Sequence, residues 1–166
     1  LGGIGFFSLI AASYYDFKSI TIIDKDDNKL KIAKKLGAHE VINPNKRKLL
    51  NNSYDYCIDT AGKVETIEKS FDLINSKGLA IFCSHPDHSK KVRLNPFDFI
   101  LGKRLIGSWG GETKLKRDLT KYIKILKKSK IDLNKYFNKT YSLDEINNAV
   151  SDFKSGKTLR PIIKVC

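Results

Sequence analysis

The first residues of the chain constrain its fold more than any other stretch. Leu1-Gly2-Gly3-Ile4-Gly5 is followed by an apolar, helix-forming run, and Asp24 stands nineteen positions after Gly5, at the end of a β-branched run. A glycine loop that opens a helix, with an acidic residue about 20 positions further on, is the dinucleotide-binding fingerprint G-x-G-x-x-G. The first glycine of that pattern would fall one position before Leu1, so we expect the chain to start inside its own motif, as the C-terminal part of a longer protein.

Each part of this motif has a physical task. Gly2 lets the backbone approach a pyrophosphate, Gly5 lets helix and strand pack closely, and the free N–H groups at the start of the helix bind phosphates. Asp24 accepts hydrogen bonds from an adenosine ribose. Because glycines also serve in plain turns, the spaced acid is what makes a nucleotide site the favoured interpretation.

Short apolar runs alternate with helical patterns along the rest of the chain. The predicted strands are 19–23, 39–43, 54–60, 79–83, 103–109 and 162–165, and the predicted helices follow Gly5 and cover 30–36, 64–74, 95–101, 115–126 and 146–153. A capping box at 142–145 opens the last helix. This alternation predicts an α/β fold, a Rossmann-like doubly wound parallel sheet truncated at its N-terminus.

Composition narrows the choice of partners. The 31 basic and 18 acidic residues give a net charge of +13, which could indicate a nucleic-acid partner. Because lysine is spread through almost every segment without interleaved aromatic residues, we favour a solvated basic surface and expect no nucleic-acid partner. No apolar run approaches the roughly 20 residues of a membrane span, so no membrane partner is expected.

The cysteines and histidines predict neither a disulfide nor a metal site. Cys57, Cys83 and Cys166 lack C-x-x-C spacing and are typical of small buried side chains in a reducing, cytoplasmic setting. His85 and His88, in a polar segment, invite a metal interpretation, but nothing nearby completes a ligand set.

A series of short motifs then resembles, in order, the cofactor half of the medium-chain zinc-type alcohol dehydrogenases. The motifs are 1–5, Ile23-Asp24, 34–38, Asp59-Thr60-Ala61-Gly62, Ser108-Trp109-Gly110-Gly111, 143–147, and 155–157 through Arg160-Pro161. The resemblance covers essentially the whole chain. It implies an NAD-binding Rossmann domain at 1–111, and C-terminal helices and a strand at 112–166 that return toward a missing catalytic domain.

The resemblance also implies roles for individual residues. The cofactor-binding set is Gly2, Gly3, Ile4, Gly5, Asp24, Lys29, Thr60, Ala61, Cys83, Ser84, His85, Trp109 and Arg160. In it, Asp24 holds the adenosine ribose with Lys29 beside it, and the 83–85 segment and Trp109 meet the nicotinamide end. Arg160 offers a fork of donors to the pyrophosphate, although a surface ion pair is the alternative role for this side chain.

Asp24 also predicts which cofactor is bound. Its carboxylate would repel a 2′-phosphate, so NAD is favoured over NADP. The adjacent positive charge of Lys25 leaves NADP as an alternative cofactor.

The chain departs from the family pattern in three ways. The Cys and His ligands of the catalytic zinc precede the glycine loop in the family, so we expect no catalytic or metal-binding residue here and zinc only in the missing domain. The first strand, central to the sheet, is absent. Ser84 stands where the family often has glycine.

These expectations together predict the cofactor-binding part of an NAD-dependent alcohol dehydrogenase. In the intact enzyme a hydride would pass between a small alcohol or carbonyl substrate and NAD, assisted by zinc. A homodimer or homotetramer is expected, with pairing through the edge strand 103–109. Two alternatives stay open: a zinc-free quinone or enoyl reductase of the same superfamily, and a non-catalytic nucleotide- or nucleic-acid-binding module. A methyltransferase also uses a glycine loop and a strand-end acid, but the ordered C-terminal match argues against it.

Overall fold

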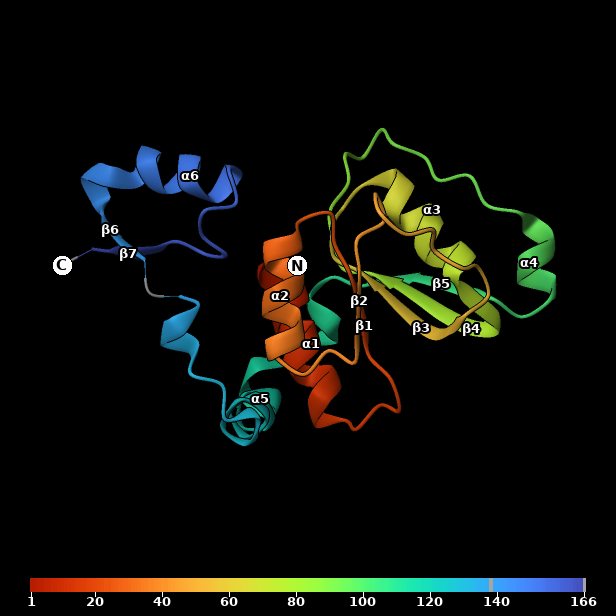
Figure 1. Ribbon diagram of the computed structural model, residues 1–166, viewed down its shortest axis with the longest axis horizontal. Coiled ribbons are helices and arrows are strands. Elements are labelled where there is room, and N and C mark those ends of the chain that lie inside the picture. Colours follow the sequence, from red (N-terminus) through yellow and green to blue (C-terminus); the bar gives the residue numbers. More distant parts are fainter. Residues whose placement is uncertain (138, 166) are drawn as a thin grey trace.

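The computed structural model describes residues 1–137 and 139–165, in which helices and parallel strands alternate (Figure 1). The helices are α1 (Gly3–Tyr14), α2 (Asp27–Lys35), α3 (Val64–Leu73), α4 (Pro96–Ile100), α5 (Leu115–Ser129) and α6 (Ile146–Lys154). The strands are β1 (Thr21–Ile23), β2 (Glu40–Ile42), β3 (Tyr54–Asp59), β4 (Ile74–Phe82), β5 (Arg104–Gly107), β6 (Thr140–Ser142) and β7 (Ile162–Lys164). The 3-10 turns are η1 (Gly110–Glu112), η2 (Leu133–Lys135) and η3 (Leu143–Glu145). The predicted α/β fold is confirmed.

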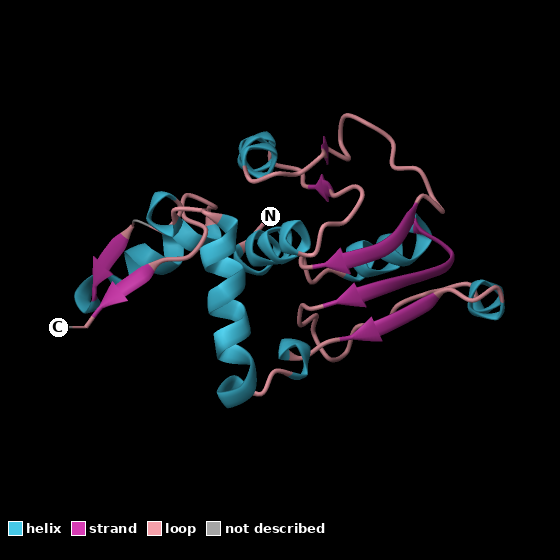
Figure 2. Cartoon of the chain, turned by 90° about the horizontal axis from the view of Figure 1, so that it is seen from below, coloured by secondary structure: helices cyan, strands magenta, loops and turns pink. Residues whose placement is uncertain are grey.

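The sheet that the sequence predicts as one unit is present in separate parts. β1 pairs with β2, the order β3-β4-β5 forms a second sheet (Figure 2), and β6 pairs with β7, all in parallel. In the doubly wound order 3-2-1-4-5-6, the strand before the glycine loop lies between the positions of β1 and β3. Because no strand among the described residues takes that position, β2-β1 and β3-β4-β5 are not joined by hydrogen bonds.

One face of the three-stranded sheet is covered by α3 (Figure 1). Phe71 of α3 is buried with Ile74 and Ala80 of β4 in one apolar cluster. The apolar residues that recur at helical spacing in α3 therefore face the sheet, as expected for an amphipathic helix.

The boundary between α3 and β4 differs from the prediction. β4 begins at Ile74 rather than at Leu79, and its regular pairing with β3 starts at Leu79 after a register shift. A Cβ on Gly78 would lie 2.7 Å from Ile74 Cβ, so only glycine fits where the strand bends back on itself. Ile74 is fully buried, and apolar periodicity does not distinguish the end of a buried helix from the start of a buried strand.

The larger core lies between α1, α2 and α5. Its buried members are Phe6, Leu9, Ile10, Ile20, Ala33, Leu36, Ala38 and Ile125. The Phe6 ring lies 5.1 Å, centroid to centroid, from both the Tyr136 and the Phe137 rings. Residues beyond 112 thus pack directly against the glycine-loop helix, and the division at 111/112 stays a proposal.

The C-terminal region contains one strand that the sequence did not predict. β6 has one buried residue, Tyr141, between an exposed threonine and an exposed serine, so no apolar run marks it, unlike the equally short β1, β2 and β7. It ends at the predicted capping box, in which Ser142 N and Oγ donate to the Glu145 carboxylate at 2.9 and 3.0 Å. This box opens η3, which leads into α6.

Two further sequence expectations concern the thiols and membranes. Cys57 and Cys83 are free thiols, and Cys166 lies outside the described residues. None of the helices in the described part of the chain is long and apolar enough to cross a bilayer.

We predict that Phe6→Ala lowers the free energy of unfolding by about 3 to 5 kcal/mol, because it empties a fully buried site between α1 and the C-terminal aromatic rings. Urea denaturation followed by circular dichroism measures the change. Leu50→Ala is the control: this residue is 68% exposed, and we expect a change within about 0.5 kcal/mol. Equal losses in the two variants would contradict the packing described here.

Candidate functional site

The N-terminus of α1 is open to an anion. Gly2 is the N-cap residue, no side chain caps the helix, and its first turn carries no acidic residue. A Cβ on Gly2 would meet nothing within 4 Å, so the backbone there is accessible. The first N–H groups of a helix lack intrahelical partners and lie at the positive end of its dipole. A phosphate could therefore bind here without displacing protein atoms at Gly2.

Two residues distant in sequence approach this glycine loop. The Arg160 guanidinium carbon lies 3.8 Å from the position of a Cβ on Gly3, and Thr60 Oγ1 lies 3.0 Å from that of a Cβ on Gly5. The close approach predicted at Gly5 is therefore to the turn that follows β3. The ion pairs among the described residues do not include Arg160, so its guanidinium is available to a ligand.

Asp24 lies at the carboxyl end of β1, beside the glycine loop. Its side chain is 14% exposed, Oδ1 accepts a hydrogen bond from Asp26 N at 2.9 Å, and Oδ2 contacts the amino group of Leu1. A ribose at Asp24 would therefore have to replace the Leu1 contact. Lys29 carries its charge near the same amino group, and its role beside the ribose stays a prediction.

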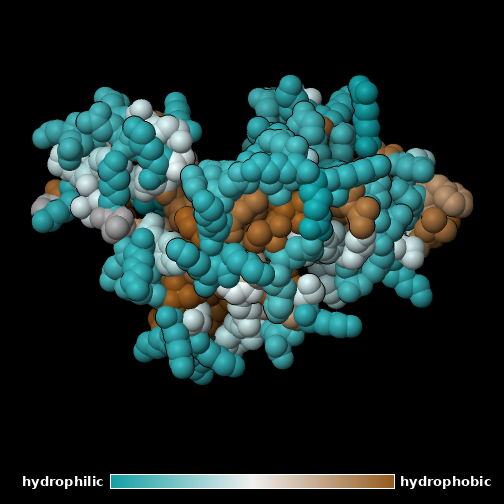
Figure 3. Space-filling model, viewed as in Figure 1, coloured by the Kyte–Doolittle hydropathy of each residue, from teal (hydrophilic) through white to brown (hydrophobic). Residues whose placement is uncertain are grey.

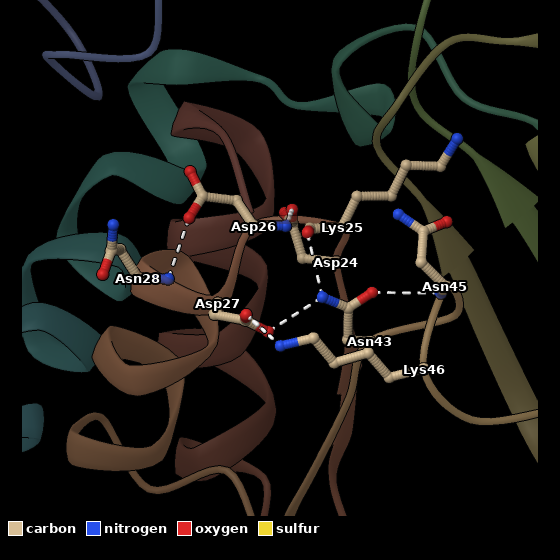
Figure 4. Close-up of polar contacts among 8 residues, drawn as sticks. All are labelled: Asp24, Lys25, Asp26, Asp27, Asn28, Asn43, Asn45 and Lys46. Carbon is tan, nitrogen blue, oxygen red and sulfur yellow. Dashed lines mark hydrogen bonds and ion pairs between the residues drawn. The ribbon is translucent and has the colours of Figure 1, made fainter.

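Asn43 is a site residue that the sequence analysis missed (Figure 4). Its amide, 9% exposed at the end of β2, donates to Lys25 O at 3.0 Å and to Asp27 Oδ1 at 2.8 Å. Its Oδ1 accepts from Asn45 N at 3.0 Å. Asn43 therefore ties the turn that carries Asp24 to the neighbouring strand. The available signal was a polar residue directly after an apolar run and before a proline.

Asp59 is the second residue whose role was missed. Its carboxylate is 6% exposed and accepts from Ser84 Oγ at 2.9 Å, Gly62 N at 3.2 Å and Ala61 N at 3.4 Å. These bonds join the turn after β3 to the loop after β4. Asp59 ends β3 as Asp24 follows β1, and this repeated strand-end position was the available signal.

Gly62 has both a conformational and a steric reason to be glycine. Its φ of +72° lies in the left-handed region, and a Cβ there would lie 3.0 Å from Ser84 Cβ. The turn at 60–62 and the loop at 83–85 therefore touch directly.

The nicotinamide-end residues of the prediction also come together. His85 and Trp109 make an edge-to-face ring contact with centroids 4.1 Å apart, which joins the ends of β4 and β5. Cys83 N donates to Asp59 O at 2.9 Å. Thr60, Ala61, Cys83, Ser84, His85 and Trp109 thus follow three neighbouring strands at one edge of the sheet, where ligands bind in open α/β folds.

The thiols at this edge are neutral at physiological pH. Burial raises the pKa of the Cys57 thiol to about 11, and the charge of Asp59 adds to the effect. The same two causes raise the pKa of the Cys83 thiol. Neither cysteine is therefore an activated nucleophile.

The residues present do not fit zinc. No cluster of three His, Cys, Asp or Glu side chains suited to a metal ion occurs in the described ranges. His88 Nδ1 lies 4.0 Å from the Asp87 carboxylate on a fully exposed loop. These described residues therefore offer no ligand set for a zinc ion.

Comparison with known proteins decides the family. A family profile described as zinc-binding dehydrogenase matches residues 3–128. The chain belongs to this family. Alcohol dehydrogenase 1 of Pisum sativum is 23% identical to the chain, over 99% of the chain and 46% of the relative. This family member therefore spans about half the length of the curated relatives it matches.

Solved structures agree with the fold. Benzyl alcohol dehydrogenase from Acinetobacter calcoaceticus superposes with a TM-score of 0.90 at 25% identity, over 99% of the chain and 48% of that protein. A putative zinc-binding dehydrogenase from Sinorhizobium meliloti, described as bound to NADP, gives 0.79 at 20% identity, over 90% and 46%. The resemblance to medium-chain zinc-type alcohol dehydrogenases is confirmed, and the methyltransferase alternative is removed.

We predict that Asp59→Asn shifts the pH midpoint for alkylation of Cys83 to lower pH, because it removes a negative charge that disfavours the thiolate. The rates are measured with iodoacetamide across pH in a chain carrying Cys57→Ser and Cys166→Ser. Asp55→Asn, on the same strand but bonded to Asn75, is the control and should leave the midpoint unchanged. An unshifted midpoint in Asp59→Asn would show that burial alone sets this pKa.

Proposed function

We propose that this chain is the cofactor-binding part of an NAD-dependent alcohol dehydrogenase. The observation that carries the proposal is the grouping around one glycine loop of a helix N-terminus without a side-chain cap, a strand-end carboxylate, and an arginine that forms no ion pair with another described residue. Each matches one part of a dinucleotide. Family membership supports a dehydrogenase, and the named relatives are alcohol dehydrogenases.

The cofactor would lie across the carboxyl ends of the strands. Its pyrophosphate would bind the N–H groups at Gly2 and Gly3 under Arg160, and its adenosine ribose would bind Asp24. Its nicotinamide would lie toward the 83–85 segment and Trp109. The dinucleotide supplies the hydride chemistry when bound, and the residues of this chain bind and orient it.

The preference for NAD over NADP is part of this proposal. A 2′-phosphate would face the Asp24 carboxylate, whose charge opposes it. Lys25 is exposed next to Asp24, and the Sinorhizobium meliloti protein is described as bound to NADP, so NADP is the competing cofactor.

We also propose that the whole protein pairs with a second copy of itself, through the edge strand β5. β5 ends the β3-β4-β5 sheet, and next to it α4 exposes an apolar group, visible at one end of the molecule in Figure 3. The group consists of Phe97, Phe99, Ile100, Leu101 and Ile106. An unpaired edge flanked by apolar side chains favours pairing with a second copy. We propose a homodimer or homotetramer in the cytoplasm, acting on a small alcohol or carbonyl compound, with a zinc-free quinone or enoyl reductase as the alternative enzyme.

We predict that the chain binds NADH more tightly than NADPH and that Asp24→Ala abolishes this preference, weakening NADH by about tenfold. The reason is loss of the acceptor for the ribose hydroxyls together with loss of the charge that opposes the 2′-phosphate. Titration of NADH fluorescence measures both affinities. Asp144→Ala, an exposed change on η3, should behave like the wild type. A preference that survives in Asp24→Ala would overturn the assigned role.

We predict that Arg160→Ala weakens both NADH and ADP-ribose by about tenfold, because both ligands carry the pyrophosphate that the guanidinium would bind. Arg160→Lys should recover only part of the loss, since an ammonium cannot form the bidentate contact. Calorimetric titration gives both affinities. Arg93→Ala, on an exposed loop, controls for lost positive charge, and equal effects at both positions would leave only a general electrostatic role.

A further inference from the structure

The loops at the ends of β3 and β4 are held together by one buried charge. The three hydrogen bonds that the Asp59 carboxylate accepts from described residues come from these two loops: from Ala61 N and Gly62 N on one side, and from Ser84 Oγ on the other. We propose that the bond between Ser84 and Asp59 is a latch that positions the nicotinamide half of the cofactor. The proposal rests on the proposed function, and it makes Asp59 and Ser84 positioning residues, which act through the loops they hold.

Because Asp59 is buried, its hydrogen bond with Ser84 favours the one loop arrangement in which the two side chains meet. The Asp59 carboxylate is 6% exposed, and a buried charge is tolerated only while hydrogen bonds compensate for lost water. The two backbone donors lie within three residues of Asp59, so they fix the local turn alone. Cys83 N donates to the Asp59 carbonyl at 2.9 Å, which pairs the two strand ends through the backbone. Ser84 Oγ, 25 positions away in sequence, is the donor that ties the Asp59 carboxylate to the second loop.

Ser84 also packs against the turn that follows β3. Its Cβ fills the space beside Gly62 that a side chain on Gly62 would need. Its hydroxyl gives the loop a donor to offer the carboxylate. Packing and hydrogen bonding therefore join the same two loops.

The restraint extends to the next strand. His85 follows Ser84 directly, and its ring rests edge to face on Trp109 at the end of β5. Fixing Ser84 therefore limits where His85 can lie, and with it the Trp109 contact. The ends of β3, β4 and β5 are thereby held in register on the side proposed for the nicotinamide.

The adenosine and pyrophosphate contacts lie outside the latch. Asp24 is bonded to Asp26 and Leu1, and Arg160 lies beside Gly3; within the described chain no hydrogen bond or ion pair joins Asp24 or Arg160 to Asp59 or Ser84. Loss of the latch should therefore affect a ligand with a nicotinamide and spare one without it. NADH and ADP-ribose form such a pair.

The experiment compares the two ligands by calorimetry on variants of the full chain. Ser84→Ala removes the donor but keeps Cβ, Ser84→Thr keeps a hydroxyl, and Asp59→Asn removes the charge. We expect Ser84→Ala and Asp59→Asn to weaken NADH by about 5- to 20-fold while ADP-ribose changes by less than about twofold. Ser84→Thr should restore NADH binding. Ser76→Ala and Asp55→Asn, on the same strands but at their opposite ends, are matched controls.

A second readout follows the nicotinamide itself. Trp109 is the single tryptophan of the chain, so energy transfer from it to bound NADH reports their separation. At saturating NADH, transfer should fall in Ser84→Ala and recover in Ser84→Thr. A loss of global stability alone would not change this signal in the folded, saturated protein, and circular dichroism verifies folding. If Asp59→Asn does not fold, the serine variants decide.

The outcomes separate the two levels of the proposal. Equal weakening of NADH and ADP-ribose, or no difference between Ser84→Ala and Ser76→Ala, would overturn the latch and leave the proposed function standing. Failure of the wild-type chain to bind either ligand would overturn the proposed function and the latch with it.

Discussion

The close approach of α1 to the end of β3 is the contact on which the candidate site depends. Gly5 permits it, because a side chain there would press against Thr60 Oγ1. With α1 in this place, its free N-terminal N–H groups lie at the same edge as the ends of the parallel strands, and Arg160 can rest against Gly3. A helix displaced outward by a side chain at this position would still be a helix, but its N-terminal N–H groups would lie farther from the strand ends.

Two carboxylates at this edge show how partners decide a role. Asp24 and Asp59 both stand where a strand ends, yet Asp59 is bound by donors from two loops and Asp24 has one backbone donor and the amino group of Leu1. A carboxylate whose acceptor sites are filled by its own chain serves structure, whereas one with an exchangeable partner can serve a ligand. Both residues have the same position in sequence, at the end of a strand, and only their hydrogen-bond partners distinguish their roles.

This difference also explains what the sequence could predict. The fold class, the glycine loop, Asp24 and the capping box at Ser142 follow from local spacing, because helices, strands and caps are set by neighbours in sequence. The start of β4, the strand β6, and the roles of Asn43 and Asp59 do not. Asn43 acts on a carbonyl 18 positions away and Asp59 on a hydroxyl 25 positions away. Long-range pairs of this kind leave no periodic pattern in a single sequence.

The serine at position 84 changes how ordering costs are distributed. A glycine in a ligand-facing loop leaves backbone freedom that must be lost when a ligand binds. Ser84 has a side chain and forms a hydrogen bond to a buried charge, so part of that ordering occurs during folding instead. The neighbouring Gly62 has a left-handed conformation, which the turn itself demands. The chain thus has glycine where backbone geometry requires it and serine where a side chain can hold two loops together.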